Sequence, residues 1–143
     1  MDKNMLDVKD YKGRGYMPLV DYSLWRVAVL NTPPARPAKR TRKVSRHMET
    51  DEVFILVEGR AVLVIGGKSS KPRDKLKTVK MKENLMYNVK KRTWHTALLA
   101  KGSKIIIVEN RKTTLRNSPR YVLNPDQNSF LASLEKRHKL FMD

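Results

Sequence analysis

Residues 45–59 read SRHMETDEVFILVEG, and this stretch carries most of what the sequence says about the fold. Its second half is rich in strand-forming residues, and a glycine separates it from a second apolar run over residues 61–65. Two such runs around a glycine predict a β-hairpin. Because alternate side chains of a strand share a face, Glu52, Phe54 and Leu56 are expected to point to the same side.

The remaining sequence predicts more strands and one helix. Further strands are expected at residues 19–30, 76–81, 85–89, 93–100 and 103–109. Asn124 can cap a helix, Pro125 suits its first position, and Gln127 follows the cap by three residues. The spacing of apolar residues after this cap predicts a helix over about 125–141.

The chain length of 143 residues predicts a single domain. We expect an N-terminal arm over residues 1–17, a barrel over about residues 19–112 and the C-terminal helix after it. Seven or eight closely spaced strands before one helix, a count taken roughly from the turn signals, favour an all-β antiparallel sandwich or barrel.

A second stretch, residues 87–95 with the sequence YNVKKRTWH, adds a histidine after a short strand and a charged turn. Together the two stretches resemble the cupin motifs, in which His-x-His is followed after four residues by Glu and after six more by Gly, and a later turn leads to another His. His47, Glu52 and Gly59 keep the first spacing, and His95 stands at the later position. The resemblance implies a double-stranded β-helix, the jelly-roll barrel of that superfamily.

The resemblance also implies a metal centre at the mouth of the barrel. The first motif histidine corresponds to Ser45, so three ligands carry over, namely His47, Glu52 and His95. Two imidazoles and one carboxylate suit a divalent Fe, Mn, Ni, Cu or Zn ion and leave positions open for substrate. Each of the three residues taken alone fits a structural role better than a ligand role, and only their joint spacing favours a metal site. A cupin barrel that binds no metal is the alternative.

Several functions are compatible with such a barrel. The first is a metal-dependent small-molecule enzyme, which by resemblance would be an isomerase or epimerase, an oxygenase or a decarboxylase. Glu49, close to His47, and Tyr87 are the candidate catalytic residues. The second function is a non-catalytic ligand-binding or sensing cupin, which the serine at position 45 favours.

The third candidate, a nucleic-acid-associated protein, comes from the charge. The chain has 31 Lys plus Arg against 14 Asp plus Glu, a formal net charge of +17. The basic run over residues 36–46 contains no aromatic residue for base stacking, so we do not expect nucleic acid as the partner. Basic residues also precede His47 and His95, and a cationic rim attracts anions. We therefore expect a small anionic ligand, sugar-like or a carboxylate.

The composition excludes other classes. Cysteine is absent, which excludes disulfides, thiolate zinc sites and thiol catalysis. The first ten residues are polar and do not resemble a signal peptide, and no apolar run is long enough to span a membrane. We expect a cytoplasmic protein without membrane contact.

The outward-facing side of the central strand predicts a homodimer. Val53, Ile55 and Val57 are as apolar as the inward set, whereas a strand with one solvated face should alternate. We expect a second copy or the N-terminal arm to cover this face. The alternative is coverage by the C-terminal helix of the same chain.

Overall fold

A computed structural model describes residues 2–32 and 42–138. Its strands form two five-stranded antiparallel sheets that face each other. The first sheet, sheet A, has the order β1 (Gly15–Tyr22), β2 (Trp25–Asn31), β9 (Lys104–Asn110), β4 (Glu52–Glu58) and β7 (Met86–Val89). The second, sheet B, has the order β10 (Arg120–Val122), β3 (Lys43–Ser45), β8 (His95–Leu99), β5 (Ala61–Ile65) and β6 (Lys77–Lys80).

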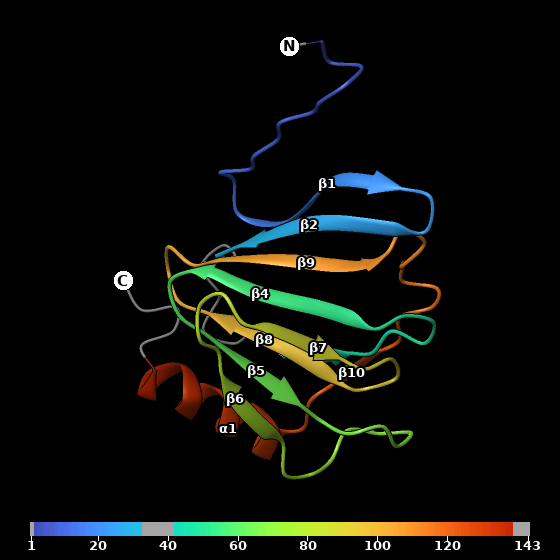
Figure 1. The fold of residues 1–143 in the computed structure, drawn as a ribbon. Coiled ribbons are helices and arrows are strands. Elements are labelled where there is room, and N and C mark those ends of the chain that lie inside the picture. The colour runs from blue at the N-terminus through green and yellow to red at the C-terminus, as the bar shows by residue number, and fades with distance from the viewer. Residues whose placement is uncertain (1, 33–41, 139–143) are drawn as a thin grey trace.

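This strand order is that of a jelly roll. Without the edge strands β1 and β10, the sheets run β2–β9–β4–β7 and β3–β8–β5–β6 (Figure 1). Consecutive strands of this set lie in opposite sheets, except for β5 and β6, which form a hairpin within sheet B. The predicted all-β jelly-roll barrel followed by a C-terminal helix is therefore confirmed.

Every second side chain of the central strands points into the interior between the two sheets. In β9 the side chains of Ile105 and Ile107 are buried and their neighbours are half-buried. In β4 the buried side chains are Glu52, Phe54 and Leu56, the set that shares a face by sequence. The apolar side chains of these two strands pack with residues of the facing sheet, such as Leu63 and Leu99, into one core cluster.

The helix α1 (Pro125–Arg137) covers the other face of sheet B. It begins with the predicted capping box: the backbone N–H of Gln127 donates to Asn124 Oδ1 at 2.8 Å, and the backbone N–H of Asn124 donates to Gln127 Oε1 at 3.0 Å. Leu131 and Leu134 pack on Val62 and Leu98 of sheet B. The expected extension of the helix to residue 141 lies partly outside the described residues.

The outer face of sheet A is not covered by α1. Val53 and Ile55 are half-buried, and Val57 is 39% exposed. Figure 1 shows the N-terminal segment extending away from the sheets rather than across this face. No helix in the described part of the chain is long and apolar enough to cross a membrane.

Four strands, β1, β2, β3 and β10, differ from the sequence expectation. Residues 19–30 are not one strand but most of the hairpin β1–β2, whose two-residue turn contains Ser23 with a positive φ of 48°. The sequence predicts no strand at β3 or β10. They pair with each other, with Ser45 opposite Arg120, and three residues are too few to show a period of two.

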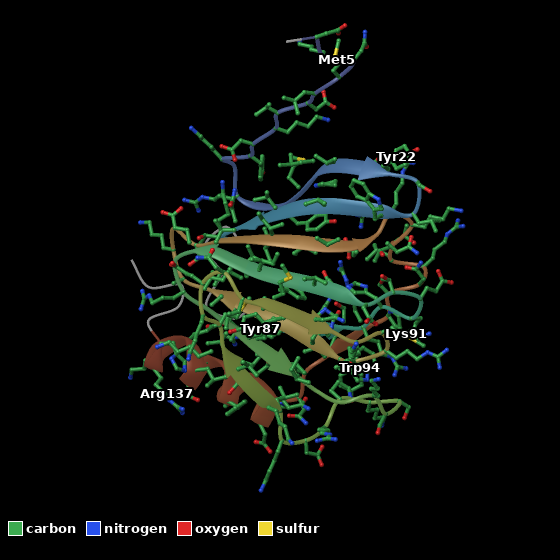
Figure 2. All side chains as sticks on the ribbon, viewed as in Figure 1. Met5, Tyr22, Tyr87, Lys91, Trp94 and Arg137 are labelled. Carbon is green, nitrogen blue, oxygen red and sulfur yellow. The ribbon has the colours of Figure 1, made fainter. Side chains whose placement is uncertain are left out.

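The excess of basic side chains is spread over the surface. Figure 2 shows nitrogen-tipped side chains around the whole outline of the molecule. The part of the basic run that lies in residues 33–41 is outside the described residues. Lys43, which follows it, is exposed in β3, whereas Val44 is buried under the helix.

Candidate functional site

Three side chains from different elements meet at one end of the barrel. Glu52 is the first residue of β4 in sheet A, His95 is the first residue of β8 in sheet B, and His47 lies between β3 and β4. Both Nε2 atoms approach the same carboxylate oxygen: Glu52 Oε2 lies 2.6 Å from His47 Nε2 and 2.8 Å from His95 Nε2. The structure therefore brings together the three residues predicted as metal ligands.

The turn before His95 is tied to the stretch that contains His47. The carboxylate of Asp51 accepts hydrogen bonds from the backbone N–H of Lys91 at 2.8 Å and from Asn88 Nδ2 at 3.1 Å. The backbone N–H of Arg92 donates to the carbonyl of His47 at 2.7 Å. Arg92 has a φ of 68°, so an arginine adopts the left-handed conformation that favours glycine.

The outer nitrogen of each histidine is held by a hydrogen bond. His95 Nδ1 lies 2.8 Å from the carbonyl oxygen of Thr93, which can only accept, so Nδ1 donates. The Ser118 hydroxyl donates to Asn117 Oδ1 at 3.2 Å and accepts from His47 Nδ1 at 2.7 Å. Both Nε2 atoms are therefore the inward-facing nitrogens, as in metal-binding histidines whose second nitrogen is anchored.

The ionisation of the cluster follows from this geometry. Burial alone would raise the pKa of Glu52. The hydrogen bonds and positive charges of His47 and His95 outweigh this effect and lower the pKa to about 2. Burial lowers the pKa of His47, and the hydrogen bond to Glu52 with the charges of Glu52 and Glu109 more than reverses this and raises it. Because an ionised carboxylate cannot donate a hydrogen bond, each contact between Glu52 and a histidine needs either a proton on Nε2 or a cation between the two groups.

These donors fit a divalent cation. The ligand atoms of His47, Glu52 and His95 all lie within 4.8 Å of one another, and two of the three residues are buried. Imidazole nitrogen and carboxylate oxygen are the donors that first-row metals share. A cation bound here would replace the protons that the Nε2 atoms otherwise need, without disturbing the anchored Nδ1 atoms.

A second buried carboxylate lies next to the cluster. Glu109, at the end of β9, accepts hydrogen bonds at Oε1 from the Tyr16 hydroxyl at 2.6 Å and from Arg26 Nη2 at 2.7 Å. Its other oxygen, Oε2, lies 3.9 Å from His47 Nε2. Burial, followed by the hydrogen bond to Glu109, raises the pKa of Tyr16, so its hydroxyl keeps its proton.

A cavity of about 620 Å³ opens onto these groups. This volume lies within the range of roughly 300–1,000 Å³ that is usual for small-molecule sites. The cavity is lined by Tyr16, Leu30, Ser45, His47, Glu52, Phe54, His95, Thr96, Ala97, Leu99, Ile107, Glu109, Thr113, Thr114, Leu115, Ser118 and Arg120. Apolar residues of both sheets thus share its wall with the three ligand candidates, Glu109 and several hydroxyls.

The two predicted catalytic residues lie elsewhere. Glu49 is exposed, and its Oε2 accepts a hydrogen bond from Asn117 Nδ2 at 3.0 Å. The Tyr87 hydroxyl accepts from the backbone N–H of Lys82 at 2.9 Å, and Figure 2 places Tyr87 away from Trp94, which precedes His95. Neither belongs to the described residues that line the cavity. A catalytic role for either stays a prediction.

Sequence reasoning missed Glu109, Tyr16 and Arg120. The alternation of β9 contained a signal for Glu109, because it shares the parity of the buried Ile105 and Ile107. Tyr16 and Arg120 had no comparable local signal. Arg120 lies in β10, which pairs with the distant strand β3, and Tyr16 contacts Glu109, which is 93 residues away in sequence.

The sequence matches no protein-family model and, at the significance required, no curated protein. Solved structures do match. Pac13 of Streptomyces, described as a nucleoside dehydratase and solved with uridine, aligns with a TM-score of 0.55 and 9% identity over 82% of this chain and 87% of its own. A 3,4-ketoisomerase from Helicobacter canadensis aligns with a TM-score of 0.50 and 15% identity over 77% of this chain and 74% of its own.

A cupin-2 domain protein from Shewanella frigidimarina is 24% identical, with a TM-score of 0.45 over 69% of this chain and 84% of its own. At such identities a structural likeness shows a shared fold and leaves the activity to the site. The jelly-roll strand order, with Pac13 and the ketoisomerase aligned over most of the barrel, establishes that this chain has the cupin fold.

Proposed function

We propose that this protein is a metal-dependent small-molecule enzyme whose divalent cation is held by His47, Glu52 and His95. The observation that supports this most is the approach of two imidazole Nε2 atoms to one carboxylate oxygen while both Nδ1 atoms are anchored. Iron, manganese, nickel, copper and zinc all suit this donor set. Isomerisation or epimerisation, oxygenation and decarboxylation are the reaction classes that the cupin resemblance implies.

A cation bound there would polarise a substrate oxygen and stabilise negative charge that develops on it. The chain's own residues supply the rest of the site. Glu109 presents Oε2 towards His47, while Tyr16 and Arg26 hold Oε1, so this carboxylate is fixed in orientation. It can accept a hydrogen bond or a proton from a ligand hydroxyl, a role for which it is better placed than Glu49 or Tyr87.

Metal content tests the proposal. The purified chain is stripped with a chelator, dialysed against each of the five metals in turn, and analysed by mass spectrometry for metal per chain. We expect near-stoichiometric binding of at least one metal, and its loss in His47→Ala and His95→Ala. The third histidine, His138 at the end of α1, supplies a matched control, since His138→Ala should bind metal as the wild type does.

Binding of none of the five metals, or equal binding by the wild type and the His47 and His95 variants, contradicts the proposal. That result would favour a ligand-binding or sensing cupin without metal. One observation favours this second function: His47, Glu52 and His95 already satisfy one another when the imidazoles are protonated. Ser45 at the first motif position agrees with it, because a serine removes one imidazole.

We also propose that a second copy of the chain covers the outer face of sheet A. Val57 is 39% exposed and Met86 is 77% exposed on this sheet, and α1 packs on the other sheet instead. Size-exclusion chromatography with light scattering should give the mass of a dimer, and Ile55→Lys should give a monomer that stays folded. A wild-type monomer at micromolar concentration would contradict this.

A further inference from the structure

Arg120 is a cation on the wall of the cavity. Its backbone pairs with Ser45, and its guanidinium has no hydrogen-bond or ion-pair partner among the described residues. The other arginines near the site are occupied. Arg26 is bound to Glu109, while Arg46 stacks over Trp94 with its guanidinium carbon 4.5 Å from the ring centroid and donates to the carbonyl of Ser69.

The strand register places Arg120 in one row with the histidine cluster. Arg120 pairs with Ser45 across β10 and β3, and Ser45 pairs with His95 across β3 and β8. Because neighbouring strands lie about 4.8 Å apart, the backbones of Arg120 and His95 are about 10 Å apart. A small molecule can therefore contact the guanidinium and the cluster at once.

The three side chains of this row also face the same way. The residues next to them in sequence, Val44, Trp94 and Tyr121, pack in the cluster under α1 on the opposite face of sheet B. Alternation along each strand then turns Ser45, His95 and Arg120 towards the cavity, which all three line. The orientation follows from the packing of their neighbours and not from the flexible arginine alone.

Ser45 lies between the two ends of this row, at the position where the cupin resemblance places a further histidine. A serine is smaller than a histidine, so it leaves space between His95 and Arg120, and its hydroxyl can donate to an anion. At the cluster, Glu52 lies 2.6–2.8 Å from both imidazoles and Glu109 is bound to Arg26, so the cations there already have carboxylate partners. The guanidinium end is therefore where an anionic group is favoured.

From this geometry we propose that the cavity binds a hydroxylated small anion, with its carboxylate or phosphate group on Arg120 and Ser45 and a hydroxyl oxygen at the His47, Glu52 and His95 cluster. The cluster end of this arrangement rests on the proposed function. The guanidinium end does not, since it needs only Arg120 and Ser45. An arginine fork matches the oxygens of both anionic groups, and this chemistry is shared by sugar acids and sugar phosphates.

Isothermal titration calorimetry on the full chain tests the proposal with matched probes. D-glucuronate is compared with D-glucose, and D-ribose 5-phosphate with D-ribose, so that each anion has a neutral counterpart and the two pairs distinguish carboxylate from phosphate. Arg120→Gln removes the proposed anchor. Arg116→Gln removes the same charge from an exposed loop residue that does not line the cavity, and serves as the control.

We expect the wild type and Arg116→Gln to bind at least one anion about ten-fold more tightly than its neutral counterpart, the size expected for charge-assisted hydrogen bonds at a partly exposed site. Arg120→Gln should lose this preference and Arg120→Lys should keep part of it, with unchanged circular dichroism. No preference in the wild type, the same preference in Arg120→Gln, or an equal loss in Arg116→Gln overturns the proposal.

Metal loading of the same proteins separates this inference from the proposed function. Arg120→Gln is expected to bind metal as the wild type does, because Arg120 is not among the ligand candidates. If the chain binds no metal but prefers anions in a way that depends on Arg120, the anion subsite is supported and the metal-dependent activity is contradicted. If the chain binds metal but shows no anion preference, the metal site is supported and the anion subsite is contradicted.

Discussion

Replacing Glu52 by glutamine should reveal how strongly the carboxylate interacts with the two histidines in the metal-free protein. The substitution keeps the size of the side chain and removes the charge that both Nε2 atoms approach. A pKa that falls from 4.5 to about 2 in the folded chain stabilises the charged form by about 3 kcal/mol, because one pH unit is worth about 1.4 kcal/mol. Glu52→Gln should lose a stabilisation of about this size, since the group is buried.

The directions of the two pKa shifts determine how the contributions of Glu52 and His47 to stability depend on pH. The pKa of Glu52 is lowered on folding, so its stabilisation is complete above the unfolded value of 4.5 and is lost as the pH falls towards 2. The pKa of His47 is raised, so its stabilisation is complete below the unfolded value of 6.5 and is lost as the pH rises through the folded value. The free-energy difference between the wild type and Glu52→Gln should therefore be largest between about pH 5 and pH 6.5.

Urea unfolding followed by tryptophan fluorescence, in the presence of a chelator and at pH 3, 5.5 and 9, measures this difference. Glu83→Gln is the matched control, because Glu83 is exposed and lies in a turn away from the cavity lining. The strong net positive charge destabilises every variant in acid, and the difference between wild type and variant cancels most of this effect. A difference that is equal at the three pH values, or below about 1 kcal/mol at pH 5.5, would refute the reasoning.

Four further substitutions test the fold. Gly59→Ala should destabilise the chain by more than about 2 kcal/mol in urea unfolding, because Gly59 has a φ of 91° and a new Cβ would lie 2.7 Å from Ser103 Cα. Gly15→Ala, with a φ of 80° and nothing within 4 Å, should cost only about 1 kcal/mol, and equal losses would contradict the steric argument. Leu134→Ala should lower the unfolding free energy by about 2–5 kcal/mol and leave metal stoichiometry unchanged. Asn124→Ala should cost about 1 kcal/mol in thermal unfolding through loss of the capping box, and an unchanged melting temperature would count against that cap.

The elements that sequence predicted well are those with strong local patterns. The strands before and after Gly59 become β4 and β5, and the cap at Asn124 begins α1. The split of residues 19–30 into two strands was not predicted, because its turn at Ser23 contains neither glycine nor proline. The edge strands β3 and β10 are short and polar, and they become strands because they pair with each other.

The residues of the candidate site also fall into those that a local sequence pattern identifies and those that it does not. His47, Glu52 and His95 could be selected from sequence because their spacings resemble known motifs. Glu109, Tyr16 and Arg120 could not be selected in the same way, since each enters the site through strand pairing. Tyr16 and Glu109 are 93 residues apart in sequence, and their side chains meet at 2.6 Å.

What the sequence by itself determined is local: which residues alternate, where strands and the helix begin, and which side chains could bind a metal. A period of two tells which residues of one strand share a face but not which distant strand lies opposite. Only the tertiary structure decided that sheet A carries Glu52 to face His95 of sheet B, 43 residues away, at 2.8 Å. It also decided that Arg120 lines the same cavity, because long-range pairing and closure of the two sheets place it there.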